Sequence, residues 1–150
     1  MRAALAVSAS STTRVSVGLL PLTTERTYPT ELANAVARGA VVVDIRTSAE
    51  RTVQGILPGA LAIDSALLTQ RLDPAGAGRL ALAVDLDVEW IVVSEDGSAA
   101  HRSVEVLQEL GLRRVTGLVG GYAAVRAADL VDALTRAQHI ADDVARVTAH

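Results

Sequence analysis

The sequence predicts an α/β fold: a three-layer domain in which a mostly parallel central sheet carries helices on both faces. Continuous apolar runs rich in β-branched residues, typical of strands buried on both sides, occur at residues 40–45 and 90–93. Segments with helical periodicity separate these runs, and such alternation favours parallel pairing. The 150 residues are half apolar, yet they include no Phe, one Trp and two Tyr, so small branched side chains must form the core. This length suits one domain.

The first half of the chain alternates helix and strand. Residues 30–38 form a helix with Leu32 and Val36 on one face, and Gly39 ends it before the strand at 40–45. The pattern then predicts a short helix capped by Ser48 and running through Val53, a turn at residues 55–59, a strand at 60–63 and a helical stretch at 65–72.

The second half repeats the alternation after a loop at residues 75–88, in which residues 80–84 are expected to form a helical turn. The strand at 90–93 leads through a polar loop at 94–99 into an amphipathic helix at 100–110. That helix directs Val104, Leu107 and Leu110 inward and stops at Gly111. A strand at 115–119, a turn at Gly120-Gly121 and a helix at 122–128 follow.

Both ends of the chain differ from this middle part. Residues 1–22 lack periodicity and are interpreted as a flexible arm, residues 23–130 as the domain, and residues 131–150 as an amphipathic helical extension. The apolar positions of the extension are Val131, Leu134, Ala137, Ala141, Val144 and Val147. Two interpretations stay open: the helix folds back on its own domain, or it contacts another protein or a second copy as a homodimer.

Composition excludes several classes of function. The net charge is −3, and the 14 basic residues are all Arg without a dense run or aromatic stacking partners, so nucleic acid is not expected. The absence of cysteine removes disulfides, thiolate metal sites and a cysteine nucleophile. His101, His139 and His150 lack ligand spacing, so neither a metal nor another cofactor is predicted. No apolar stretch reaches the roughly 18–20 residues of a membrane span, and the weakly apolar start favours a cytoplasmic location.

A candidate site follows the strand at 90–93. In parallel sheets, ligands bind beyond the carboxyl ends of the strands, where this loop, Asp44 and the end of the strand at Ile63 are expected. Backbone N–H groups at the start of the following helix would form an anion-binding loop, and a side chain in its first position would lie at the centre. The residues of this loop are Ser94, Glu95, Asp96, Gly97, Ser98 and Ala99.

Five segments in order resemble the rhodanese-like superfamily of sulfurtransferases. They are Val43–Arg46, Gly55–Ala60, Ile91–Ser94, Leu110–Leu112 and Leu118–Tyr122. The resemblance covers roughly residues 21–130, and the ordered set is more specific than any single motif. It implies an α/β domain in which a cysteine after the central strand accepts a sulfur atom as a persulfide and passes it to a thiophilic acceptor.

The sequence departs from that family pattern at the residue that carries the chemistry. Ser94 occupies the cysteine position, and a hydroxyl cannot carry a persulfide. Ala99 replaces the loop arginine that binds the anionic substrate, while Glu95 and Asp96 add negative charge; alternatively, these two acids are simply placed favourably at the N-terminus of the following helix. Elsewhere Ile56 replaces a turn histidine and Val125 a tryptophan.

These departures predict a non-catalytic rhodanese-like module that binds a small anion or a protein. The alternative is a sulfurtransferase represented by a Cys-to-Ser variant. A phosphatase of this fold is equally unexpected, because it also needs the thiolate. A serine hydrolase is disfavoured because no general base is evident near Ser94: His101 is expected two turns along the following helix, away from the loop. The resemblance implies that Asp44 and Arg46 help to order the site; alternatively they form an ion pair that holds the strand end.

Overall fold

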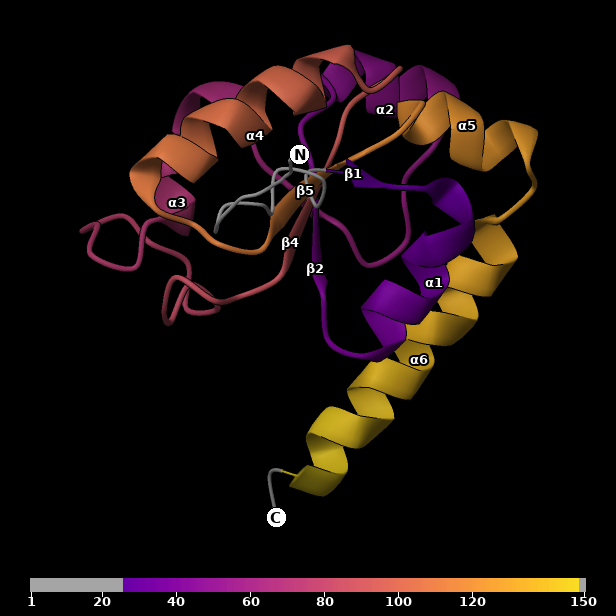
Figure 1. The fold of residues 1–150 in the computed structure, drawn as a ribbon. Coiled ribbons are helices and arrows are strands. Elements are labelled where there is room, and N and C mark those ends of the chain that lie inside the picture. The colour runs from indigo at the N-terminus through magenta and orange to yellow at the C-terminus, as the bar shows by residue number, and fades with distance from the viewer. Residues whose placement is uncertain (1–25, 149–150) are drawn as a thin grey trace, which may run out of the picture.

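The computed structural model describes residues 26–148, which form one parallel sheet between two layers of helices (Figure 1). Every neighbouring pair of strands is parallel. The strand order is β1 (Arg26–Thr27), β5 (Val115–Leu118), β4 (Trp90–Val93), β2 (Val41–Asp44), β3 (Leu61–Ala62). The predicted α/β architecture is therefore confirmed. The predicted arm at residues 1–22 lies outside the described residues.

The central strand β4 shows why its sequence is apolar throughout. Ile91 and Val93 face a core shared with α1 (Pro29–Ala37), α5 (Gly121–Ala127) and α6 (Val131–Thr148). Trp90 and Val92 face the opposite core, which α4 (Ser98–Leu110) and the segment of η3 (Ser65–Leu67) and α3 (Leu68–Leu72) cover. All four side chains of β4 are fully buried, as expected for a strand with helices on both sides.

Two local predictions outside the β4–α4 segment need correction. The cap of α2 (Ser48–Gln54) is Thr47, because its Oγ1 accepts the N–H of Glu50 at 3.1 Å while Glu50 accepts the N–H of Thr47 at 2.9 Å. This reciprocal pair is a capping box and makes Ser48 the first helical residue. Residues 80–84 form turns rather than a helical segment, anchored by the fully buried Ala83.

The helix after β4 begins two residues earlier than predicted. Ser98 and Ala99 belong to the first turn of α4, so the loop itself comprises residues 94–97. The predicted inward position of Leu110 is wrong, because its side chain is 38% exposed. Ala100 instead joins Val104 and Leu107 on the buried face, at the i, i+4, i+7 spacing of one helical stripe.

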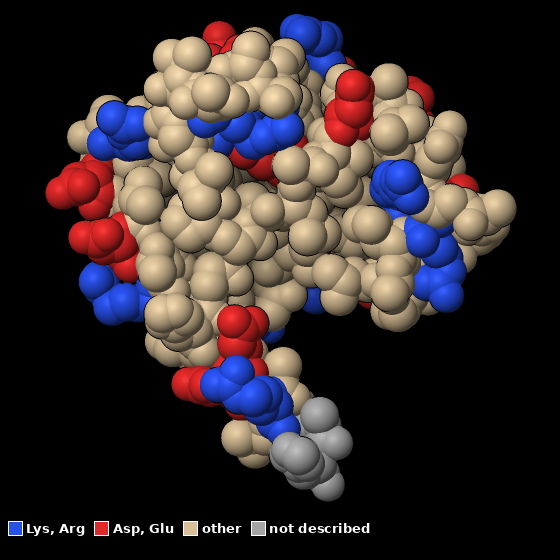
Figure 2. Space-filling view, turned by 180° about the vertical axis from the view of Figure 1, so that it is seen from behind, with Lys and Arg blue, Asp and Glu red and all other residues tan. Residues whose placement is uncertain are grey.

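The last helix is partly packed and partly exposed (Figures 1 and 2). Leu134 and Ala137 are buried in the core that α1 shares, whereas Val144 is 52% and Val147 74% exposed. The nine residues of α1 span only about 14 Å, and the 18 residues of α6 about 27 Å, so α6 extends beyond its partner. None of the helices described is long and apolar enough to cross a membrane.

Candidate functional site

Parallel pairing brings the predicted site segments to one edge of the sheet. Asp44 at the end of β2 is in register with Val93 at the end of β4, and with Ala62 of β3 on its other side. Ser94 follows Val93 directly. The residues after β2 and the loop after β4 therefore leave the sheet side by side, as the carboxyl-edge argument predicts.

Ser94 lies at the centre of its loop. Its Oγ accepts the backbone N–H of Gly97 at 3.0 Å and that of Ala100 at 3.2 Å. The side chain is nearly enclosed, with 4% of the residue exposed. The two amides that could receive an anion at this position thus already have an acceptor within the protein.

The start of α5 packs against this loop and donates hydrogen bonds to its backbone. Tyr122 and Ala123 donate their N–H groups to the carbonyl oxygens of Ser94 and Glu95, at 2.9 and 3.0 Å. A Cβ atom on Gly121 would lie 2.3 Å from the Ser94 oxygen, so only glycine permits this approach. Sequence reasoning assigned the glycine pair to a turn and missed this packing role. The signal available was its place between a strand and an aromatic residue.

The two acidic residues of the loop differ in their environment. Asp96 Oδ1 accepts the N–H of Ser98 at 3.0 Å and its hydroxyl at 2.7 Å, and these hydrogen bonds lower the pKa of the Asp96 carboxyl. Asp96 therefore satisfies the first N–H of α4, whose N-cap residue is Gly97. Glu95 does not share that role: its Oε1 is buried, and no hydrogen-bond partner lies within the described part of the chain.

Asp44 and Arg46 form a buried ion pair. Arg46 Nη2 lies 2.8 Å from Asp44 Oδ2 and also donates to the carbonyl of Gly55 at 2.9 Å, while Nη1 donates to Gln54 at 3.1 Å. The guanidinium carbon is 3.8 Å from the centre of the Tyr122 ring. With its donors directed to protein atoms, Arg46 joins the end of β2 to α2 and α5, which favours the ion-pair interpretation over ligand contact.

Other residues singled out by the sequence do not converge on Ser94. Ala99 is in the first turn of α4, Ile56 is an exposed residue after α2, and Val125 lies on the buried face of α5. The expected position of His101 is wrong, since it is only the fourth residue of α4, where it lies 3.9 Å from Glu105. Among residues 26–148, no imidazole or carboxylate hydrogen-bonds the Ser94 hydroxyl.

A small cavity of about 240 Å³ opens at the same sheet edge. Residues that follow β2 and β3 line it, among them Thr47, Arg51 and Ser65. Ser94 is not part of this lining. In the portion described, no group of three or more His, Asp or Glu side chains is placed to hold a metal ion.

Comparisons with known proteins agree with this architecture. Residues 28–128 match the family described as the rhodanese-like domain. Among solved structures, a Rhodopseudomonas palustris protein of unknown function, described as a possible tyrosine phosphatase, superposes with a TM-score of 0.64 at 22% identity, over 72% of this chain and 83% of that one. The human single-domain sulfurtransferase TSTD1 superposes with a TM-score of 0.59 at 24% identity, over 69% of this chain and 96% of that one.

A rhodanese-like domain protein from Staphylococcus aureus gives a TM-score of 0.54 at 21% identity, over 67% of this chain and 90% of that one. These identities are low, so the three likenesses bear on the fold alone. No curated protein sequence matches the chain.

Proposed function

Because the chain belongs to the rhodanese-like domain family, we propose that it is a non-catalytic member whose 94–97 loop serves recognition instead of sulfur transfer. The main support for this proposal is that Ser94 lies at the centre of the loop. In sulfur transfer from thiosulfate, a thiolate attacks the outer sulfur, a sulfur–sulfur bond forms and sulfite leaves. A serine hydroxyl offers no sulfur for that bond, and the chain contains no cysteine to replace it.

The environment of Ser94 favours a protein partner over a small anion. The amides of Gly97 and Ala100 are occupied by the Ser94 hydroxyl, so an anion would have to displace it from a nearly enclosed position. The carboxylate of Asp96 is exposed beside it and repels anions. A partner presenting hydrogen-bond donors or basic side chains would meet no such repulsion.

The direct test is a thiosulfate:cyanide sulfurtransfer assay of the unaltered chain. We expect no thiocyanate above the buffer rate, because no persulfide can form. Sulfur transfer by the unaltered protein at rates typical of an enzyme would overturn the proposal. Binding partners of the loop can then be sought with Asp96→Arg, an exposed change that reverses its charge, and Glu109→Arg in the last turn of α4 as the matched control.

The second candidate, a sulfurtransferase represented by a Cys-to-Ser variant, is supported by the same geometry. Two amides directed at the side-chain atom of residue 94 are what a thiolate at that position would need. Ser94→Cys, incubated with thiosulfate and analysed by intact mass, is expected to gain one sulfur atom if only the nucleophile is missing. Ser103→Cys, in the body of α4, is the control that should remain unmodified.

That experiment, together with the codon at position 94 of the source gene, distinguishes a natural serine from a replaced cysteine. A persulfide on Ser94→Cys, together with a cysteine codon at position 94 in the source gene, would identify the natural protein as a sulfurtransferase. A serine codon keeps the non-catalytic proposal. Adding Ala99→Arg to Ser94→Cys should then raise the rate of sulfur uptake, since it restores positive charge where thiosulfate must approach.

The exposed half of α6 is the surface for which we propose self-association. Val144 and Val147 continue the apolar stripe that Leu134 and Ala137 begin, beyond the point where α1 covers it. If two copies paired antiparallel about Val144, Asp142 of one helix would face Arg146 of the other, and the reverse pair would form by symmetry. The cytoplasmic location stays a prediction, which fractionation of the source cells would test.

A further inference from the structure

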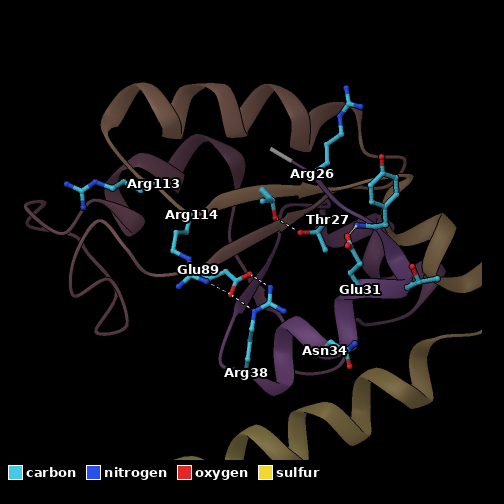
Figure 3. A pocket seen from close by; sticks show the side chains of 11 residues that line it. Arg26, Thr27, Glu31, Asn34, Arg38, Glu89, Arg113 and Arg114 are labelled. Atoms are coloured by element: carbon cyan, nitrogen blue, oxygen red, sulfur yellow. Dashed lines mark hydrogen bonds and ion pairs between the residues drawn. The ribbon is translucent and has the colours of Figure 1, made fainter. Parts of the chain in front are cut away.

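A second cavity lies at the opposite edge of the sheet from Ser94 (Figure 3). Its volume is about 680 Å³, within the range of small-molecule sites. It is bounded by α1, by the edge strand β1 and by the residues that precede β4 and β5. Glu89, which lines the cavity, directly precedes β4, and Ser94 directly follows it. The length of the strand therefore places this part of the cavity roughly 16 Å from the Ser94 loop.

Positive charge is concentrated in this wall although the chain as a whole is acidic. Arg26, Arg38, Arg113 and Arg114 line the cavity, against two carboxylates, Glu31 and Glu89. Glu31 is held by the backbone N–H of Tyr28 at 2.9 Å. Arg113 pairs with Asp87 at 2.9 Å and points away from Glu89, as Arg26 does, so Arg38 and Arg114 are the two guanidinium groups that meet at this carboxylate (Figure 3).

We propose that this cavity binds a small ligand through an oxyanion group, a phosphate or a carboxylate, held between Arg38 and Arg114. Both guanidinium groups converge on the carboxylate of Glu89 (Figure 3). Arg38 donates through Nε and Nη2 at 3.1 and 2.6 Å, and Arg114 through Nη2 at 3.2 Å. The two cations are thus fixed close together by a single anion.

These contacts leave donors for a ligand. A guanidinium group has five N–H donors, and the contacts with Glu89 use two of them in Arg38 and one in Arg114. The Glu89 side chain is mostly covered, whereas both arginine side chains are more than half exposed. The carboxylate therefore orients the two groups, and their remaining N–H bonds are accessible to an oxyanion, which arginine binds strongly through paired hydrogen bonds.

Hydroxyl groups extend the polar wall beyond the arginines. The Oγ1 atoms of Thr27 and Thr116 lie 2.6 Å apart across β1 and β5. Thr30 and the partly exposed Tyr28 complete this side. A small ligand with its charged end at Arg38 and Arg114 and hydroxyl or amide groups beyond fits this distribution of side chains.

The simplest competing explanation is architectural: the arginines only fasten the end of α1 to β4 and β5 through Glu89. Glu89→Gln distinguishes the two, because it removes a negative charge from between the arginines. If the cavity binds an oxyanion, this change should tighten binding several-fold while lowering the unfolding temperature. An architectural role predicts the lower unfolding temperature alone.

The test is a calorimetric and NMR titration of the full chain with pyrophosphate and, separately, with citrate, at constant ionic strength. We expect saturable binding of one anion per chain, with amide shifts at Glu89 and Arg114. Arg38→Gln or Arg114→Gln should weaken it about tenfold, as expected for the loss of a charged hydrogen-bond donor. Arg102→Gln, on the exposed face of α4, is the control and should leave affinity unchanged.

The two ligands identify the source of the oxyanion: tighter binding of pyrophosphate indicates a phosphate compound, and tighter binding of citrate a carboxylate. The proposal is overturned if neither anion saturates, if Glu89→Gln leaves affinity unchanged or weakens it, or if Arg102→Gln weakens binding as much as Arg114→Gln. Because Glu89→Gln is expected to strengthen binding, its result does not depend on how well the arginine variants fold.

Discussion

Gly121 is the residue on which the geometry of the Ser94 loop depends most directly. The change Gly121→Ala would place a Cβ atom 2.3 Å from the Ser94 carbonyl oxygen and 2.7 Å from the backbone of Glu95. Both neighbours are backbone atoms, which cannot rotate away as a side chain can. The φ of Gly121 is also +63°, a value that alanine adopts only with strain.

The expected loss of stability has two parts. Backbone strain at a positive φ costs about 1–3 kcal/mol. Separation of the loop from α5 would also weaken the hydrogen bonds from Tyr122 and Ala123 to the loop carbonyls, at about 1 kcal/mol each. Gly39→Ala isolates the first part, because φ at Gly39 is +108° and nothing lies within 4 Å of its Cβ position. Gly121→Ala should therefore cost about 2 kcal/mol more than Gly39→Ala.

Urea unfolding followed by tryptophan fluorescence measures this difference. Trp90 is the only tryptophan and is fully buried in β4, so its emission reports loss of the core. For a denaturant slope of about 2 kcal/mol per molar, the midpoint of Gly121→Ala should fall about 1 M below that of Gly39→Ala. Coincident midpoints would refute the reasoning, since they would mean that the loop and α5 are not held in close contact.

The remaining predictions concern the ion pair, the loop centre and the last helix. Asp44→Asn leaves the buried Arg46 without its counter-charge and should cost about 3–5 kcal/mol in the same urea experiment; a loss below about 1 kcal/mol would contradict the buried pair. Ser94→Ala removes the acceptor of two amides and should cost about 1–3 kcal/mol, whereas a variant as stable as the parent would show that water replaces the hydroxyl. In sedimentation velocity, the parent chain should form dimers and Val147→Glu should be monomeric with an unchanged unfolding midpoint; a parent that is monomeric at every concentration tested would exclude self-association through α6.

Local sequence patterns predicted the elements well where one physical constraint dominates. The strand at 90–93 was placed correctly, because four consecutive large apolar residues rich in β-branched side chains are typical of a strand buried on both faces. The helix after it was less well placed. Its start depends on the side chain of Asp96 and on the positive φ of Gly97, and neither feature has a periodic signature.

Some features of the candidate site could likewise be predicted from the sequence, and others could not. The position of Ser94 at the end of the central strand, and the absence of a thiol there, can be read from the sequence. The burial of its hydroxyl under two amides could not, since an anion-binding loop and a filled loop share the same pattern. The role of Arg46 was also open, and only the proximity of Gln54, Gly55 and Tyr122 favours the structural alternative.

By itself the sequence determined the alternation of strands and helices, the parallel sheet and the serine at the family's cysteine position, because each depends on residue type or on spacing within one segment. Only the tertiary structure decided which segments meet. The contact of Gly121 with Ser94 and the convergence of Arg38 and Arg114 on Glu89 each join residues at least 25 positions apart. Such contacts depend on how elements pack against one another, and no pattern within a single element encodes that distance.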